Sequence, residues 1–318
     1  LHHIISDGLS MEILTDEFVR LYQGQELEQL QFQYKDYAHW QSNLQESDMM
    51  KEDEEYWLEQ FDDQVPILEL PTDYSRPTSR TFAGNSIGLR LEEEITHNLI
   101  NISRKTDSTI YMVILSALNI LLAKYSGQED IVIGSPIAGR SHPELERIVG
   151  IFVNTLAMRN YPERDKSYRE FLLDVRQTAL EAYQHQDYQF ERLVDQLELR
   201  RDLSRNPLFD VMLSMHNPDR EQLEIEGLKI SPYRHDKKLS KFDLTFWAQE
   251  GEEEINFEIE YSTELFKEET IKRLASHLKN IFAQIAVDPL VKIEKIGLLT
   301  RAEREDILYG WNQTSREY

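Results

Sequence analysis

The sequence contains no cysteine among its 318 residues. This absence excludes disulfide bonds, cysteine-ligated zinc and any route through an acyl-cysteine intermediate. Long apolar runs are also lacking, since the longest, from Met112 to Ala123, is interrupted by Ser116 and Asn119. Such a run is too short and too polar for a membrane span, and no basic-then-apolar leader precedes it. We therefore expect a soluble, cytoplasmic protein with no membrane partner.

Positive charge is scarce in this chain. Lysine and arginine number 35 against 58 aspartates and glutamates, which gives a formal charge of −23. Phosphate binding needs local positive charge, and the basic residues around Lys237, Lys238 and Lys241 form no basic stripe. The composition therefore predicts no nucleic-acid partner.

What the chain does contain is typical of an α/β protein of one large or two medium domains. Hydrophobic residues make up 40% and charged residues 29%, which suits a sizeable core. Helical spacing of apolar residues predicts helices over 9–22, 34–45, 51–61, 109–126, 168–183 and 268–287. Shorter apolar or alternating runs predict strands over 86–91, 130–134, 148–158, 208–215, 242–248 and 255–261, the last two as a hairpin.

Two local signals mark helix starts and a third marks a crossing segment. We expect Ser108 to cap the helix over 109–126, and Ser167 with Glu170 to form a capping box before the next helix. The segment from Val65 to Thr81 carries three prolines and little periodicity, which predicts a linker or crossing segment between lobes. The polar stretch over 299–318 is typical of a connector to a further domain.

The chain opens with LHHIISDGLS, which gathers His2, His3, Asp7 and Gly8. On a strand, adjacent side chains point to opposite faces, so we expect one histidine to face a cavity and the other to be packed or hydrogen-bonded. Asp7 can orient a histidine or bind an arginine, and Gly8 lets the backbone turn tightly into the following helix. An imidazole base beside a helix N-terminus suits acyl transfer, because backbone N–H groups lie near a developing oxyanion. A structural histidine is the alternative that these residues leave open.

Metal chemistry is not predicted for this segment. Neighbouring histidines are a poor chelating pair, and no third ligand stands at the spacing of a metal-binding motif.

HHIISDG resembles the HHxxxDG active-site motif of condensation domains in nonribosomal peptide synthetases. The stretch LTRAEREDILYGWNQT near the end of the sequence resembles the connector from a condensation domain into an adenylation domain. One departure is Gln189, where the family usually has proline. Further stretches resemble the family's motifs in the expected order: YKDYAHW (34–40), VGIFVNTLAMR (149–159), HQDYQFE (185–191) and RDLSRNPL (201–208).

The resemblance implies a chloramphenicol-acetyltransferase-like α/β fold, with a mixed sheet, flanking helices and two related lobes in a V. The family has further motifs upstream of HHxxxDG, so we expect an incomplete N-terminal lobe. Residues 1–65 are then the end of that lobe, residues 66–298 the C-terminal lobe and residues 299–318 the connector. We expect such a fragment, taken alone, to be poorly soluble. An inactive fragment would be compatible with the resemblance.

The resemblance also implies an acyltransferase-type reaction that forms a peptide bond. The amine of an acceptor aminoacyl thioester attacks the carbonyl of a donor peptidyl or aminoacyl thioester. Both substrates arrive on phosphopantetheine arms of upstream and downstream peptidyl carrier proteins, so the domain itself binds no cofactor. An adjoining adenylation domain is the other expected partner, in an enzyme of antibiotic biosynthesis.

Site residues carried over from the family begin with His3, as general base or amine-positioning group. His2 and Asp7 match supporting positions, and Gly8 is placed so that its N–H faces the oxyanion. We expect the arginine partner of Asp7 to lie in the missing segment.

Weaker assignments concern residues that either line the substrate channel or serve as packing and turn residues: Asn154, Arg205 and Asn206. We expect His185 to be a helix-end residue rather than a second base, and Tyr34 and Trp40 to be packing aromatics.

The motif variants IISDG, FVNTLAMR and SRNPLFD resemble the type that joins two L-residues. An epimerization domain shares HHxxxDG but commonly follows it with a Val-Ser-Trp pattern that LSMEIL lacks. A heterocyclization domain is disfavoured because aspartates replace its histidines, and a free-standing CoA-dependent acyltransferase because of the connector. The alternative from another class is a noncatalytic docking scaffold for carrier proteins.

Overall fold

The computed structural model describes residues 1–45, 47–199, 202–216, 238–251 and 253–311. Within these ranges a mixed sheet of six strands runs in the order β1-β6-β5-β4-β2-β3. β4 pairs in parallel with β2 and β5, while the other neighbours are antiparallel. The strands are β1 (Gly84–Leu91), β2 (Ile131–Ile137), β3 (Asn154–Asn160), β4 (Val211–His216), β5 (Leu244–Glu250) and β6 (Ile255–Ser262).

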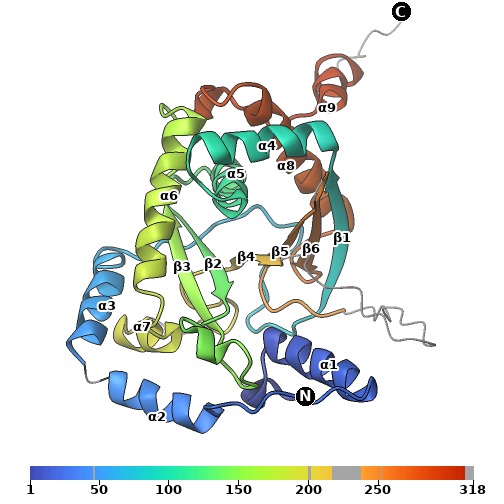
Figure 1. Ribbon diagram of the computed structural model, residues 1–318. Helices are drawn as coiled ribbons and strands as arrows, with labels where there is room; N and C mark the ends of the chain where they lie inside the picture. The colour runs from blue at the N-terminus through green and yellow to red at the C-terminus, as the bar shows by residue number, and fades with distance from the viewer. Residues whose placement is uncertain (46, 200–201, 217–237, 252, 312–318) are drawn as a thin grey trace, which may run out of the picture.

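Helices gather over one face of the sheet and at one end of it (Figure 1). α4, α5, α6 and α8 form the covering layer, whereas α1 and α2 lie beyond the C-terminal end of β2. The helices are α1 (Gly8–Tyr22), α2 (Tyr34–Leu44), α3 (Asp48–Glu59), α4 (Glu93–Lys105), α5 (Ile110–Ser126), α6 (Tyr168–Gln184), α7 (Phe190–Gln196), α8 (Glu268–Val287) and α9 (Arg301–Glu305). Short 3₁₀ turns cover His3–Ile5, Pro143–Leu145 and Ile293–Lys295, and a π turn covers Asp306–Gly310.

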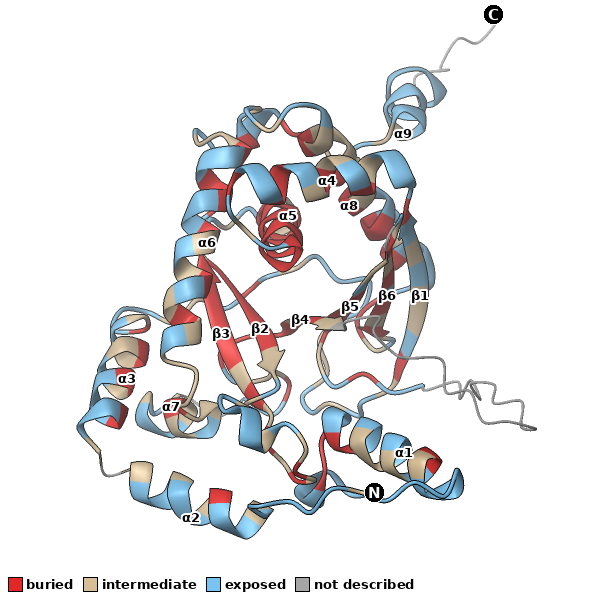
Figure 2. Ribbon diagram, viewed as in Figure 1, coloured by how far each residue is buried: buried red, intermediate tan, exposed pale blue. Residues whose placement is uncertain are grey.

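α5 forms the centre of the core. All its residues from Ile110 to Ala123 are buried, and Figure 2 shows most of this helix in red. The longest apolar run of the sequence is therefore a core helix. Thr109, rather than the expected Ser108, caps α5, and Gly127 ends it with φ +75°.

In the described part of the chain, no single helix is both long enough and apolar enough to cross a membrane. α4 and α5 meet both conditions as a pair, but the pair is bent by 107°.

Most predicted elements are confirmed, including α8, the β5–β6 hairpin and the capping box of Ser167 with Glu170. Two predictions were wrong in part. α4 and α7 were not predicted, and the strand expected over 148–158 begins at Asn154. Residues 138–153 instead form the β2–β3 loop, whose backbone groups bind side chains of other segments.

Between α3 and β1 the proline-containing segment forms no helix or strand and binds later parts of the chain. The backbone N–H of Asp73 donates to the carbonyl of Leu265 at 2.9 Å, and Gln128 Nε2 donates to the carbonyl of Ile67 at 2.9 Å. Trp57 and Phe61, which precede this segment, are buried in the same core as α5. The division at residue 65 into two lobes stays a prediction, and residues 312–318 of the predicted connector lie outside the described residues.

Candidate active site

The opening motif folds as a 3₁₀ turn over His3–Ile5, so strand geometry does not set the directions of its two histidines. His2 caps this turn, because its Nδ1 accepts a hydrogen bond from the backbone N–H of Ile4 at 3.1 Å. Ser6 Oγ donates to the carbonyl of His2 at 3.2 Å and closes the turn. Both histidine residues are exposed. The ring of His2 is thus held by its own turn, whereas His3 stands as the open imidazole of the motif.

Asp7 is the N-cap of α1 and is buried, with 7% of its surface exposed. Its Oδ1 accepts the backbone N–H of Ser10 at 2.8 Å, as N-capping aspartates do. Gly8 is the first helical residue, where a backbone N–H has no acceptor within the helix. That position is compatible with the predicted oxyanion contact, which stays a prediction.

Arg140 is the partner of Asp7, and it lies in this chain rather than in a missing segment. Its Nη2 donates to Oδ1 and Oδ2 of Asp7 at 3.0 and 3.2 Å. Its Nη1 donates to the carbonyls of Leu145 and Ile148 at 2.6 and 2.7 Å. The guanidinium lies 4.0 Å from the centre of the Phe152 ring. The ion pair is almost fully enclosed, with 3% and 6% of the two side chains exposed.

The protonation of Asp7 follows from these contacts. Burial raises the pKa of a carboxyl group, but hydrogen bonds from Ser10 and Phe152 and the charge of Arg140 outweigh it, so the pKa of Asp7 is lowered. The carboxylate is therefore ionised at neutral pH and holds Arg140 in place.

Arg140 and Ser10 are the site residues that sequence reasoning missed. Arg140 stands 133 positions after Asp7, so no local spacing indicates the pair. A weaker indication of this site is the glycine that precedes Arg140. Gly139 has φ +63°, and a Cβ there would lie 1.8 Å from the carbonyl oxygen of Phe152, so the position requires glycine.

The motifs YKDYAHW and VGIFVNT meet beside this network. Tyr34 Oη donates to the carbonyl of Ile151 at 2.9 Å, and its ring packs edge-on against Phe152. Tyr37 is buried against the same Phe152 ring, with centroids 4.5 Å apart. The expectation that Tyr34 is a packing aromatic is confirmed, whereas Trp40 is 46% exposed and lies 5.9 Å from the Tyr37 ring.

Asn154 joins the start of β3 to the turn before α7. Its Nδ2 donates to the carbonyls of Gln186 and Tyr188 at 2.9 and 2.8 Å, and its Oδ1 accepts the N–H of Phe190 at 3.1 Å. His185 ends α6, as expected, and its Nδ1 lies 2.7 Å from Asp53 Oδ1. The polar atoms of Asn154 therefore serve the framework, and its place in a substrate channel stays a prediction.

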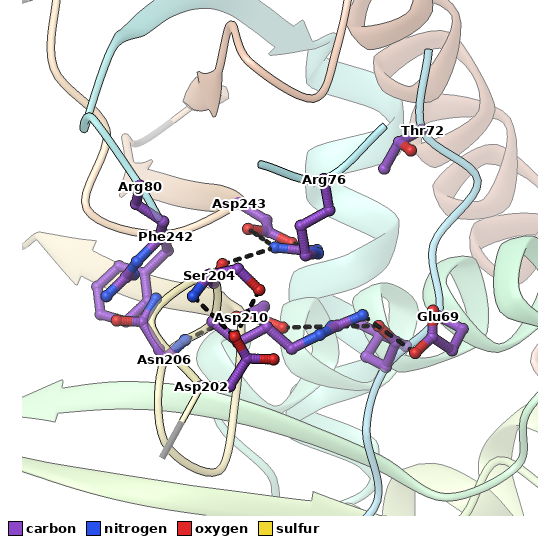
Figure 3. Close-up of polar contacts among 12 residues, drawn as sticks. Glu69, Thr72, Arg76, Arg80, Asp202, Ser204, Asn206, Asp210, Phe242 and Asp243 are labelled. Atoms are coloured by element: carbon purple, nitrogen blue, oxygen red, sulfur yellow. Dashed lines mark hydrogen bonds and ion pairs between the residues drawn. The ribbon is translucent and has the colours of Figure 1, made fainter. Parts of the chain in front are cut away.

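Asn206 belongs to a separate polar cluster at the N-terminal ends of β4 and β5 (Figure 3), and Arg205 joins this cluster through Asp210. Arg205 donates to Asp210 Oδ2 at 2.7 Å and to Glu69 Oε1 at 3.0 Å. Asn206 donates its backbone N–H to Asp210 Oδ1 at 3.0 Å and its Nδ2 to the carbonyl of Lys241 at 3.2 Å. These contacts fix the RNPL turn, so the channel assignment of this pair too stays a prediction.

Metal-ligand groups of three or more His, Cys, Asp or Glu side chains do not occur among the described residues. What converges here is an exposed imidazole, a helix N-terminus and a buried carboxylate–guanidinium pair. This arrangement can accept a proton beside backbone donors.

The condensation domain family model matches residues 1–308. Gramicidin S synthase 2 of Aneurinibacillus migulanus is 48% identical over 320 residues, covering 100% of this chain and 7% of that protein. Bacitracin synthase 3 of Bacillus licheniformis is 47% identical over 317 residues, covering 100% of this chain and 5% of that protein. The chain thus spans less than a tenth of the length of these relatives.

Solved structures with the same fold include the X-domain in its complex with OxyB from teicoplanin biosynthesis. That similarity has a TM-score of 0.85 and 26% identity, and covers 94% of this chain and 69% of that one. The condensation domain of the Monacolin K polyketide synthase MokA has a TM-score of 0.82 at 20% identity, covering 92% and 69%.

The fold is therefore the chloramphenicol-acetyltransferase-like α/β fold of condensation domains, which confirms the fold class. The chain belongs to the condensation domain family of nonribosomal peptide synthetases.

Proposed function

We propose that this chain catalyses peptide-bond formation between a donor peptidyl or aminoacyl thioester and the amine of an acceptor aminoacyl thioester. The observation that carries the proposal is the HHIISDG turn itself. It presents an exposed His3 next to a helix N-terminus, and the buried Asp7–Arg140 pair anchors it to the β2–β3 loop. The family match over residues 1–308 supports it.

The reaction replaces a C–S bond by a C–N bond, and one proton moves from the acceptor nitrogen to the leaving sulfur. The acceptor nitrogen attacks the thioester carbonyl, so a C–N bond forms and the carbonyl oxygen becomes an oxyanion. His3 takes the proton that the nitrogen must lose, or holds the amine in line for attack. When the oxyanion collapses, the C–S bond breaks and the leaving thiolate takes up the proton.

Substrate delivery in this proposal depends on partners. The two thioesters are carried by phosphopantetheine arms of upstream and downstream peptidyl carrier proteins, and an adenylation domain adjoins the chain. We further propose the type that joins two L-residues, since LSMEIL lacks the Val-Ser-Trp pattern common in epimerization domains. A cytoplasmic location stays a prediction.

A noncatalytic docking scaffold is the alternative function, and one comparison favours keeping it. The X-domain, 26% identical to this chain, was solved as a complex with OxyB. A condensation-type fold can therefore present a docking surface to a partner protein.

A single-turnover assay separates the two functions. The complete protein that carries this chain is mixed with a donor-loaded and an acceptor-loaded carrier, and the intact mass of the acceptor is followed. Catalysis predicts a gain of one acyl unit with the parent protein and none with His3→Ala. No gain with the parent, while both carriers remain bound, would establish the scaffold instead. An acceptor epimerised without mass gain would establish the epimerization domain.

A further inference from the structure

Ser10 joins the first turn of α1 to the β2–β3 loop through a side chain with 0% exposure. Its Oγ lies 2.7 Å from Asp7 Oδ1 and 2.8 Å from the carbonyl oxygen of Gly150. The same oxygen accepts the N–H of Gly150 at 3.0 Å and Arg140 Nη2 at 3.3 Å. One hydroxyl therefore contacts both backbone groups of one loop residue and both members of the buried ion pair, and its single proton is shared between Asp7 Oδ1 and the carbonyl of Gly150.

Within the described part of the chain, the turn that carries His3 has no other polar attachment of this kind. Every hydrogen bond there from residues 1–10 to a residue outside the His3–Ile5 turn and α1 is made by Asp7 or Ser10. The bonds of His2 and His3 stay within their own turn. Asp7 and Ser10 therefore make the hydrogen bonds that join the His3 turn and the start of α1 to the β2–β3 loop.

The two anchors hold different parts of the loop. Asp7 binds Arg140 and accepts the N–H of Phe152 at 3.1 Å, whereas Ser10 binds Gly150. Gly150 also lies against Tyr34, since a Cβ there would lie 2.0 Å from the Tyr34 ring. Ser10 and Tyr34 thus both contact Gly150 and restrict the position of the loop relative to α1.

We propose that Ser10 is a positioning residue for the condensation reaction. Its hydroxyl fixes the spacing between the His3 turn and the β2–β3 loop, so that the imidazole meets the attacking amine. Without the hydroxyl, the buried N–H and C=O of Gly150 lose these partners, and the loop and α1 separate to admit others. Displacements of about 1 Å at a reacting group cost on the order of 10²-fold in rate. This inference rests on the proposed function.

The test compares Ser10→Ala with two further variants in the single-turnover assay. Ser10→Thr retains the hydroxyl and is expected to restore activity. Thr15→Ala is the matched control on the same helix, because the Thr15 hydroxyl is exposed and bonds to the carbonyl of Met11 at 2.6 Å. We expect Ser10→Ala to lower the rate constant at saturating acceptor by about 10- to 100-fold. The acceptor concentration at half saturation should change by less than about twofold, since binding is not what the hydroxyl serves.

The outcomes distinguish this inference from the function on which it rests. Full activity of Ser10→Ala, with His3→Ala inactive, overturns the positioning role alone. Full activity of His3→Ala overturns the proposed function. A higher acceptor concentration at half saturation, with an unchanged rate constant, also overturns the positioning role.

Folding is checked by the unfolding transition of each variant. If Ser10→Ala does not fold, Ser10→Cys replaces it, because a thiol keeps a group at the same position but is a weak donor and acceptor. The same rate criterion then applies to the Cys variant.

Discussion

His277 and Glu303 join α8 to α9 through hydrogen bonds of 3.1 Å between the imidazole Nε2 and both carboxylate oxygens. The other ring nitrogen of His277 lies 2.7 Å from the hydroxyl of Tyr125, whose pKa burial raises to about 12. Gln284 and Asn280 continue the same face of α8 and bind the carbonyl of Gly297. The start of the predicted connector is therefore docked on the domain.

Glu303→Ala should release this docked segment. The carboxylate also accepts the N–H of Thr300, so the variant loses one half of the capping box of α9 and a partner of a buried imidazole. We expect a loss of about 1–3 kcal/mol in the free energy of unfolding and faster hydrogen exchange at residues 300–304. Glu305→Ala is the control, because that exposed carboxylate pairs with Arg301 in the same helix. Equal exchange in both variants would contradict the docking.

Asp7→Asn should destabilise the protein through Arg140. Asparagine still caps a helix, but the enclosed guanidinium loses its counter-charge. Breaking a buried pair by removing one partner costs roughly 3–5 kcal/mol. We expect that loss in urea unfolding at pH 7, together with loss of condensation. A variant as stable as the parent would show that Arg140 finds another partner.

Lowering the pH should remove the stability that the Asp7 carboxylate contributes to the folded protein. The pKa of Asp7 is lowered in the folded protein, so its contribution to stability is present above the unfolded value of 3.8. It is lost as the pH falls below 3.8 through the folded pKa. Unfolding free energies measured from pH 6 downward should therefore fall less steeply below pH 4 in Asp7→Asn than in the parent. Parallel curves would contradict an ionised Asp7.

Local signals were enough to predict α5 and α8, since helical spacing and a glycine stop act within a few residues. α4 was not predicted from the sequence because its apolar stripe is short and lies among many polar residues. The stripe consists of Ile95, Leu99 and Ile102. The strand expected over 148–158 failed for a tertiary reason. Side chains of Ser10, Asp7 and Tyr34 bind the backbone of residues 150–152, so those groups are not available to a ladder.

The candidate site was predictable in its residue types but not in its geometry. The HHIISDG resemblance identified His3, His2, Asp7 and Gly8 from adjacent letters. The partners of Asp7 and Ser10 come from the β2–β3 loop, more than 130 positions away, and depend on how β2 and α1 are placed in the fold.

Gly150→Ala should be costly because of one aromatic ring. The new methyl group would lie 2.0 Å from the Tyr34 ring, which packs against Phe152 and cannot move freely. Overpacking of this kind costs about 1–3 kcal/mol in urea unfolding. Gly88→Ala is the control, because the nearest atom to its Cβ is 4.0 Å away. Tyr34→Ala should make Gly150→Ala less harmful, and strict additivity in that double-mutant cycle would contradict the contact.

Gln189→Pro should stabilise the protein. Gln189 caps α7 with φ −72°, within the range that a proline ring imposes, and its backbone N–H donates to no described residue. Restricting the unfolded chain is worth about 0.4–1 kcal/mol at a compatible position. Gln33→Pro is a matched control of opposite sign, because Gln33 caps α2 with φ −119° and donates its N–H to Asp36. Destabilisation by Gln189→Pro in urea unfolding would mean that Tyr188 cannot take the extended backbone that a following proline requires.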